Sequence, residues 1–304
     1  MANTRIYWLH TLSPTHIGTG RGIGYIDLPI HRDKITNWPI IPGSAFKGVW
    51  ADCFGASTSK RTSPEQKLAF GMASDTVENN ANAGALVPTD ARLVCLPVRS
   101  FQGTFAWCTS ALALNLLRRD LEHAGIIDLP PQPDSPDSEQ IFHAQVTALR
   151  EGDRIYLEDL DYAAAPDEAA TNWAEQIARW VFPDDPHWQT EFQRRFAILP
   201  DASFDFLTET GTEVVARVKI NDDTRTVADR QLWTEESLPA ETIMAGLVFC
   251  DRIHAKEKDA HGVTREALLT KFATDPLILQ IGGKATVGRG RVRCVFSQFD
   301  GGGQ

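Results

Sequence analysis

The chain has 304 residues, of which 42% are hydrophobic, and a formal net charge of −10. This length and composition allow a substantial core, in one domain with insertions or in two smaller domains, and no apolar run reaches membrane-spanning length. The five scattered cysteines form no CxxC pair and the eight histidines show no paired spacing, which argues against a zinc site and favours buried free thiols. Because the first residues lack an apolar signal segment, we expect a cytoplasmic protein.

The N-terminal quarter contains one predicted strand and one predicted helix. Arg5–Leu12 is rich in β-branched and aromatic residues, as strands are, and a glycine-dense loop spans Gly18–Gly24. Ser44 follows two prolines and a glycine and is a good N-cap for a helix over 45–54. Residues 55–90 are polar and rich in Gly, Ala and Asn, which predicts a mobile surface insertion.

The middle of the chain is acidic and mixes strand and helix patterns. Ala91–Val98 predicts a strand, and Cys108–His123 carries leucines at helical spacing. Leu129–Glu139 holds four prolines and predicts a loop. Asp167–Phe196 predicts two acidic amphipathic helices, separated near its prolines.

Towards the C-terminus, Val214–Ile220 and Leu247–Arg252 bracket a polar stretch that predicts a long hairpin or arm. Ala267–Phe272 ends a helix, and 277–280 and 291–296 predict two strands around a glycine loop. Strands and helices alternate irregularly, so the expected fold class is α+β, a compact sheet-and-helix core with large insertions rather than a doubly wound sheet.

Charge is unevenly distributed along the chain. Residues 1–60 hold six basic and three acidic side chains and residues 281–304 hold four basic and one acidic, whereas Asp120–Glu209 holds twenty acidic and five basic. Phosphate binding requires Lys and Arg. The two chain ends therefore supply candidates for a cationic face on a protein that is acidic overall.

Two glycine loops are candidate binding elements. In the first, Gly18, Gly20, Gly22 and Gly24 alternate with other residues, so its backbone amides can approach an anion, but the dinucleotide fingerprint is not satisfied. The second, 281–292, lacks the Lys and Ser or Thr that a nucleoside-triphosphate P-loop requires after Gly288. Its glycines alternate with cations, which suits a sugar–phosphate backbone passing over a sheet. Flexible hairpins whose glycines only relieve strain are the alternative.

Several motifs resemble those of one protein family. LHTLSPTHIGTG at 9–20, IDLPI at 26–30 and PIIPGSAFKG at 39–48 resemble the start of RAMP-superfamily CRISPR proteins, and 282–290 resembles their C-terminal glycine-rich loop. Within the superfamily, the chain is most similar to backbone subunits of type III-B Cmr effector complexes, including at 216–227 and 232–236. The resemblance covers most of the chain, although 125–210 matches loosely.

This resemblance implies a single domain over 1–304 with an RRM-like (ferredoxin-like) core, insertions at about 55–90 and 125–210, and a protruding β-hairpin thumb within about 214–245. It implies guide crRNA, target RNA, other Cmr-complex subunits and further copies of the chain as partners, the copies stacking head to tail in a filament. The thumb would displace a base pair of the guide–target duplex at regular intervals. Target RNA would be cleaved beside each displaced pair, leaving 2′,3′-cyclic phosphate ends.

The resemblance also implies roles for individual residues. Asp27 matches the catalytic aspartate and would bind a divalent Mg or Mn ion or accept the 2′-hydroxyl proton, although an isolated Asp more often caps a loop. His16 matches a motif histidine and would share in proton transfer or contact RNA, a satisfied core histidine being the alternative. Glu235 and Glu236 would help to shape the cleavage site, and Trp233 is expected to pack.

The remaining predicted contacts are with RNA. Lys47 lies near the start of the helix after Gly43, where the helix dipole and a cation would hold a phosphate together. The predicted RNA-binding residues are Gly18, Gly20, Arg21, Gly22, Ser44, Lys47, Gly282, Gly283, Lys284, Gly288, Arg289, Gly290 and Arg291.

Two other functions stay open. The chain could be a scaffold that binds guide RNA and its neighbours without cutting, or a metabolic enzyme whose glycine loops hold a nucleotide or a small phosphate. Tight, length-dependent and salt-sensitive RNA binding would count against the enzyme, whereas saturable mononucleotide binding would favour it.

Overall fold

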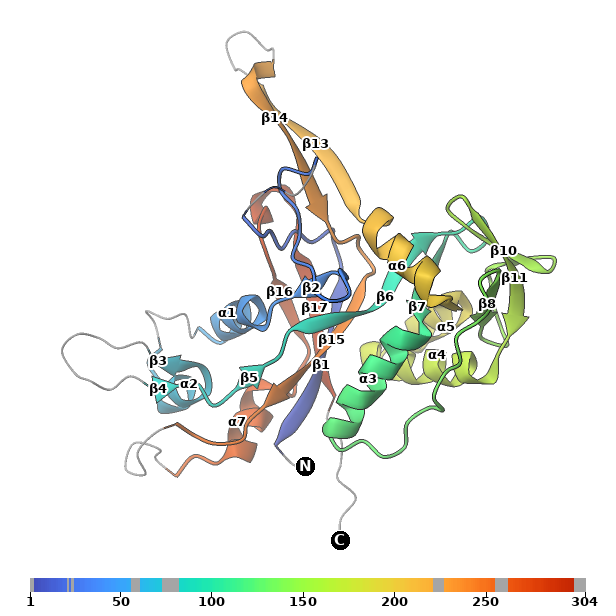
Figure 1. Ribbon diagram of the computed structural model, residues 1–304. Helices are drawn as coiled ribbons and strands as arrows, with labels where there is room; N and C mark the ends of the chain where they lie inside the picture. Colours follow the sequence, from blue (N-terminus) through green and yellow to red (C-terminus); the bar gives the residue numbers. More distant parts are fainter. Residues whose placement is uncertain are drawn as a thin grey trace.

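The structure is a computed structural model that describes residues 3–20, 22, 25–55, 61–72, 82–220, 227–254 and 262–297, with the backbone alone at 220 and 227–231. It contains a large mixed sheet, helices on both faces of that sheet and a separate projecting hairpin (Figure 1). The described helices are α1 (Gly43–Cys53), α2 (Pro64–Phe70), α3 (Ala111–His123), α4 (Glu168–Val181), α5 (Pro186–Arg195), α6 (Asp201–Thr210) and α7 (Arg265–Phe272), with a short 3₁₀ turn at Ala285–Val287.

The centre of the main sheet is built around β1 (Thr4–Thr11). This strand lies antiparallel between β17 (Arg291–Ser297) and β15 (Ile243–Phe249), and β15 pairs antiparallel with β6 (Ala91–Arg99). Across the sheet the order is therefore β17, β1, β15, β6. Along the chain, α1 connects β1 towards β6, and α7 connects β15 towards β17.

The sheet continues on both sides of this centre. Beyond β17 lies β16 (Leu277–Gln280), and beyond β6 lie further strands, of which β7–β12 and β8–β11 pair in parallel. These further strands are β7 (Phe105–Ser110), β12 (Phe196–Leu199), β8 (Gln140–His143), β11 (Leu160–Pro166), β10 (Arg154–Leu157) and β9 (Arg150–Glu151), and the short strands elsewhere are β2 (Ile40–Ile41), β3 (Gly71–Met72), β4 (Asn82–Ala83) and β5 (Val87–Pro88).

Both faces of β1 are covered. All eight of its residues are buried, and successive side chains point to opposite faces of a sheet. Tyr7 stacks on Phe46 of α1, with ring centroids 4.1 Å apart, whereas Trp8 stacks on Trp180 of α4 at 5.4 Å. The core therefore has two layers, one under α1 and α7 and one under α3 and α4.

Most predicted elements are confirmed, with shifted boundaries. The two predicted helices are α4 and α5, capped by the carboxylates of Asp167 and Asp185, but α5 is not acidic, because it carries one Glu and two Arg. The predicted helix over 108–123 begins only at Ala111, because Phe105–Ser110 is a strand that pairs with β6. The predicted strand at 247–252 begins earlier, at Ile243, and is the central strand β15.

Three local predictions were wrong. The segment 55–90, expected to be a mobile surface insertion, contains α2, whose Leu68, Ala69 and Phe70 are buried in the core. Helix α1 begins at Gly43, and Ser44 lies inside its first turn instead of capping it; the Gly43 amide instead donates to Asp90 Oδ1 at 2.8 Å. Cys53 is exposed at the end of α1, whereas the other four cysteines are buried. The error at the start of α1 concerns a position whose hydrogen-bond partner comes from a distant part of the chain.

The hairpin consists of β13 (Glu213–Ile220) and β14 (Val227–Ser237), paired antiparallel and outside the main sheet. It follows α6 and projects away from the body of the molecule (Figure 1). Since neighbouring residues of a strand face opposite sides, Thr234 pairs with Ala216 on one face, and Glu235 pairs with Val215 on the other.

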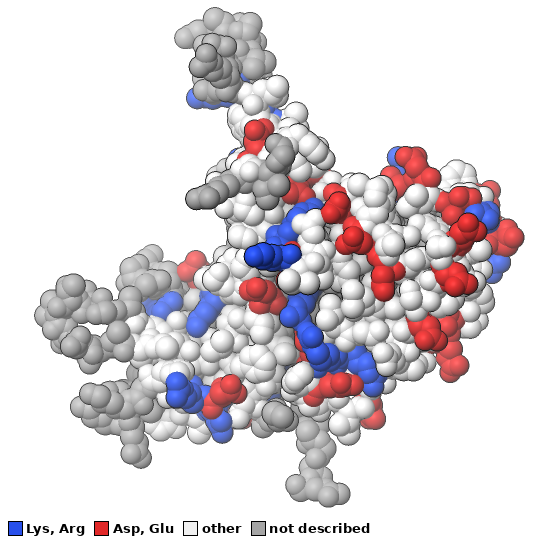
Figure 2. All heavy atoms as spheres, in the orientation of Figure 1, with Lys and Arg blue, Asp and Glu red and all other residues white. Residues whose placement is uncertain are grey.

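Acidic and basic side chains are separated on the face shown in Figure 2. Figure 2 shows Asp and Glu gathered over the lobe of α5 and β8–β11, and Lys and Arg in a band through the centre of the same face. Within the described residues, no helix is long and apolar enough to span a membrane.

Candidate functional site

The two predicted glycine loops meet at His16. The Gly283 amide donates to the His16 carbonyl oxygen at 2.9 Å, and the Gly290 amide donates to the Pro14 carbonyl oxygen at 2.9 Å. At Gly282, where φ is +82°, an added Cβ would lie 2.2 Å from the His16 carbonyl oxygen, so glycine is required there. The two chain ends therefore form one continuous surface.

His16 is buried and fixed by the hairpin. Its Nδ1 lies 2.6 Å from the backbone oxygen of Glu236, and because a carbonyl only accepts, Nδ1 carries the hydrogen. Its other ring nitrogen faces Gly18, where an added Cβ would lie 2.7 Å from Nε2. The ring thus fills the space between the first glycine loop and the base of the hairpin.

Asp27 is exposed and lies against the same strand. Its Oδ2 accepts hydrogen bonds from the Thr234 amide at 2.8 Å and lies 3.0 Å from the Thr234 hydroxyl, while the Asp27 amide donates to that hydroxyl oxygen at 3.0 Å. Leu28 forms a parallel bridge with Glu235, which holds the IDLP segment along the edge of β14. The Asp27 carboxylate is therefore attached to the hairpin base at one oxygen.

Glu235 lies on the opposite face of the hairpin and holds Lys284. The Lys284 Nζ lies 2.7 Å from Glu235 Oε1, which also accepts from the Trp233 indole at 2.7 Å, and Arg217 Nε lies 3.5 Å from Oε2. Burial alone would raise the pKa of Glu235, but hydrogen bonds from Lys284 and Trp233 and the nearby cationic charges leave that pKa below its ordinary value. Glu235 is thus an ionised anchor, and Trp233 is part of its polar cluster.

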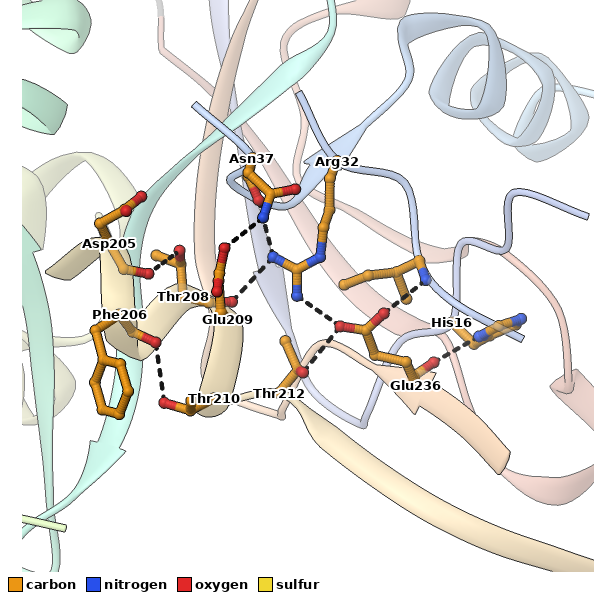
Figure 3. A network of polar contacts seen from close by, with 11 residues as sticks. His16, Arg32, Asn37, Asp205, Phe206, Thr208, Glu209, Thr210, Thr212 and Glu236 are labelled. Atoms are coloured by element: carbon orange, nitrogen blue, oxygen red, sulfur yellow. Dashed lines mark hydrogen bonds and ion pairs between the residues drawn. The ribbon is translucent and has the colours of Figure 1, made fainter. Parts of the chain in front are cut away.

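Glu236 is buried inside a polar network (Figure 3). Its Oε1 accepts from Arg32 at 2.6 Å and from the Thr212 hydroxyl at 2.9 Å, and its Oε2 accepts from the Ile30 amide at 3.0 Å. Arg32 also donates to the backbone oxygen of Thr208 at 3.1 Å. This network ties the loop after the IDLP segment to α6, to Thr212 just before β13 and to β14.

Three consecutive residues of β14 therefore hold three predicted site residues. Thr234 holds Asp27, Glu235 holds Lys284, and the carbonyl of Glu236 holds His16. Each of these contacts joins parts of the chain that are far apart in sequence. The base of the hairpin is the common support of the candidate site.

The other predicted RNA-binding cations lie in different surroundings. Arg289 forms an ion pair with Glu213 at 2.8 Å, beside the hairpin base, and Arg291 is exposed at the first position of β17. Lys47 lies on α1, which packs against β16; burial, with a smaller contribution from Arg61, lowers its pKa. Arg21 lies outside the described residues.

Sequence reasoning missed the supporting residues. Thr234 lies inside the family-like segment 232–236 but was assigned no role, and neither was Arg32 or Asp90, whose carboxylate accepts from the Gly43 amide. Among the described residues, no three His, Cys, Asp or Glu side chains converge to hold a metal ion.

Comparisons with known proteins identify the family. The model of the RAMP superfamily matches residues 8–293. The chain is 31% identical over 296 residues to the CRISPR system Cmr endoribonuclease Cmr4 of Pyrococcus furiosus, covering 97% of this chain and 96% of that protein.

Solved structures agree with this assignment. The crystal structure of oligomeric Cmr4 from Pyrococcus furiosus superimposes with a TM-score of 0.71 at 25% identity, covering 98% of each chain. A chain of the type III-B Cmr-beta complex bound to cognate target RNA shares the fold, with a TM-score of 0.70 at 18% identity over 96% of each chain. The protein belongs to the RAMP superfamily and, within it, to the family of Cmr4.

Proposed function

We propose that this chain is the backbone subunit of a type III-B CRISPR effector complex, that it binds guide crRNA, and that it cleaves complementary target RNA at regular intervals through Asp27. The likeness to Cmr4, a protein named as an endoribonuclease, supports this assignment over nearly the whole chain. Further copies of the chain, stacked head to tail, and other subunits of the complex are the proposed protein partners.

The sheet order supports an RRM-like core. Strands β17, β1, β15 and β6 lie in the order 4-1-3-2 of their positions along the chain, joined by the helical crossovers α1 and α7, which is the split βαβ arrangement. The projecting hairpin β13–β14 is the proposed thumb. It lies within the 214–245 window expected for it, apart from one residue at its start.

The observation that carries the proposal is the convergence at the base of β14. An exposed carboxylate, two glycine loops and the cations Lys284 and Arg289 are attached to one strand pair. Cations beside exposed loop backbone suit a sugar–phosphate chain, which would follow the loops and meet Asp27 where the hairpin leaves the body.

The proposed chemistry is attack by a target 2′-hydroxyl on the adjacent phosphorus. The bond to the 5′-oxygen breaks, leaving a 2′,3′-cyclic phosphate and a 5′-hydroxyl. Displacing a nucleotide from A-form geometry would allow the in-line alignment that this attack requires. Asp27 would accept the hydroxyl proton or help to hold a divalent cation.

A divalent cation could be held by Asp27 and a phosphate of bound RNA together, whereas Asp27 alone provides too few ligands. Mg²⁺ keeps several waters and takes one or two protein carboxylates plus substrate phosphate oxygens. Asp27 is exposed, whereas Glu235 and Glu236 are buried in ion pairs. A bound Mg or Mn ion would be held by Asp27 and the scissile phosphate and would stabilise negative charge on that phosphate.

Asp27→Asn in the assembled complex tests the proposal sharply. The amide oxygen of Asn can still accept the two hydrogen bonds from Thr234, so the loop stays docked while the charge is lost. We expect single-turnover target cleavage to fall by at least about 100-fold, with unchanged affinity for target RNA. Assays with Mg²⁺, Mn²⁺ and EDTA in parallel report whether the wild-type reaction needs a divalent ion.

A non-catalytic scaffold is the competing function, and one observation favours it. The contacts of Asp27 with Thr234 are those of an aspartate that docks a loop. Since Asn preserves this docking, a scaffold would leave the cleavage by the complex unchanged in Asp27→Asn, and that result would refute the catalytic proposal.

A further inference from the structure

Thr234 contacts Asp27 through both its backbone and its side chain. The amide of Thr234 donates to Oδ2 at 2.8 Å, its hydroxyl lies 3.0 Å from the same oxygen, and the Asp27 amide donates to that hydroxyl at 3.0 Å. The hydroxyl also lies 3.1 Å from the Tyr25 carbonyl oxygen. The Thr234 hydroxyl therefore contacts the Tyr25 carbonyl, the Asp27 amide and the Asp27 carboxylate.

The flanking backbone holds this arrangement in register. The Leu28 amide donates to the Thr234 carbonyl at 3.0 Å, and the Glu236 amide donates to the Leu28 carbonyl at 3.0 Å. A slip of one residue between the two segments would turn the neighbouring side chain towards Asp27. That neighbour is Trp233 or Glu235, and neither offers a hydroxyl.

The contacts with Thr234 also set the direction of the carboxylate. With Oδ2 held by two donors, rotation about the last side-chain bond of Asp27 is restricted, and Oδ1 keeps one orientation relative to the hairpin. A group that acts on a single proton or phosphate oxygen depends on such orientation, because a misplacement of 1 Å can cost about 100-fold in rate.

We propose that Thr234 is a positioning residue for Asp27, one that orients the carboxylate at the base of the hairpin without touching the target RNA. The inference rests on the proposed function of Asp27 and adds a second residue to the same reaction. It also explains why a hydroxyl, rather than an apolar β-branched side chain, occupies this strand position.

The test compares two substitutions in the assembled complex with crRNA. Thr234→Val keeps the β-branched shape and the backbone amide but removes the hydroxyl, and it should slow single-turnover cleavage by about 10- to 100-fold at saturating target. Thr234→Ser restores the hydroxyl and should recover most of the rate. Target affinity and complex assembly should match wild type in both variants.

Thr210→Val is the matched control. It removes a threonine hydroxyl at the end of α6, close to the hairpin, that contacts the Phe206 carbonyl of its own helix at 3.0 Å. We expect wild-type cleavage. Equal rates for Thr234→Val and wild type would overturn the inference, and so would a Thr234→Ser variant as slow as Thr234→Val.

A double mutant separates this inference from the proposed function. If Thr234 acts through Asp27, then adding Thr234→Val to Asp27→Asn lowers the residual cleavage no further. If Asp27→Asn alone cleaves normally, the proposed function fails. If Asp27→Asn is inactive while Thr234→Val is fully active, only the positioning role fails.

Discussion

At the scale of single residues, the base of β14 contains two neighbouring glutamates with different tasks. Glu236 is paired inside the molecule with Arg32 and Thr212, whereas Glu235 faces the second glycine loop and pairs with Lys284. Both were predicted to help shape the cleavage site. Their contacts fix the hairpin base to Arg32 and to the second glycine loop, and a role in shaping the cleavage site stays a prediction.

The lowered pKa of Glu235 predicts a pH-dependent contribution to stability. A carboxylate whose pKa is lower in the folded state stabilises the fold above its ordinary pKa and loses that contribution as the pH falls through its folded value. Glu235→Gln should therefore unfold about 2 kcal/mol more easily than wild type at neutral pH, and the difference should shrink below pH ~4.5.

Urea unfolding of the chain between pH 7 and pH 3.5 measures this difference. Glu175→Gln is the control, because it removes an exposed ion pair with Arg179 within α4, which contributes little to stability. A gap between Glu235→Gln and wild type that widens as the pH falls would contradict the assignment of Glu235 as an ionised anchor.

At the scale of elements, two glycines of the second glycine loop are required for different reasons. Gly282 and Gly288 both have positive φ, +82° and +78°, but an added Cβ at Gly282 meets the His16 carbonyl oxygen at 2.2 Å, whereas at Gly288 it meets nothing within 4 Å. One glycine is required by the meeting of two loops, and the other only by its own backbone conformation.

Alanine substitutions at these two positions should separate the two causes. Gly288→Ala should cost about 1–2 kcal/mol, the cost of a left-handed conformation for a residue with Cβ. Gly282→Ala adds a steric clash and should cost clearly more, and it should also weaken crRNA binding because the two loops no longer meet. Thermal unfolding and crRNA affinity of both variants measure this, and equal losses would count against the convergence of the loops.

At the scale of the whole molecule, an acidic protein presents a cationic band beside an acidic lobe (Figure 2). The cations of the two chain ends lie near one another because β1 and β17 are neighbours in the sheet, and the loops beside these strands therefore leave the sheet side by side. The net charge of −10 does not describe what an RNA strand would meet at this surface.

RNA binding by this surface should depend on salt through the cations at the hairpin base. Removing one phosphate-contacting cation from a site for single-stranded RNA lowers the slope of log K against log salt by about 0.7. For Arg289→Gln, we expect the slope of log K against log salt for crRNA binding to decrease by this amount. Arg179→Gln, a cation paired on the acidic lobe, should leave the slope unchanged, and equal slopes for both variants and wild type would exclude Arg289 from the RNA surface.

Much of the fold could be predicted because its signals are local. Capping aspartates and prolines mark α4 and α5, a β-branched and aromatic run marks β1, and an aliphatic run marks β6. The cap of α1 could not be predicted, because Asp90, which replaces the expected Ser44, lies 47 residues away.

By itself, the sequence determined the two glycine loops, the cationic chain ends, the lone carboxylate of the IDLP segment and the membership of a family, because all of these are properties of residue type and spacing. Only the tertiary structure decided that Thr234, Glu235 and Glu236 support the site. Asp27 and Thr234 are 207 residues apart, and their contact exists because the packed sheet brings the first loop to the base of the hairpin. Local patterns contain no information on such a pairing.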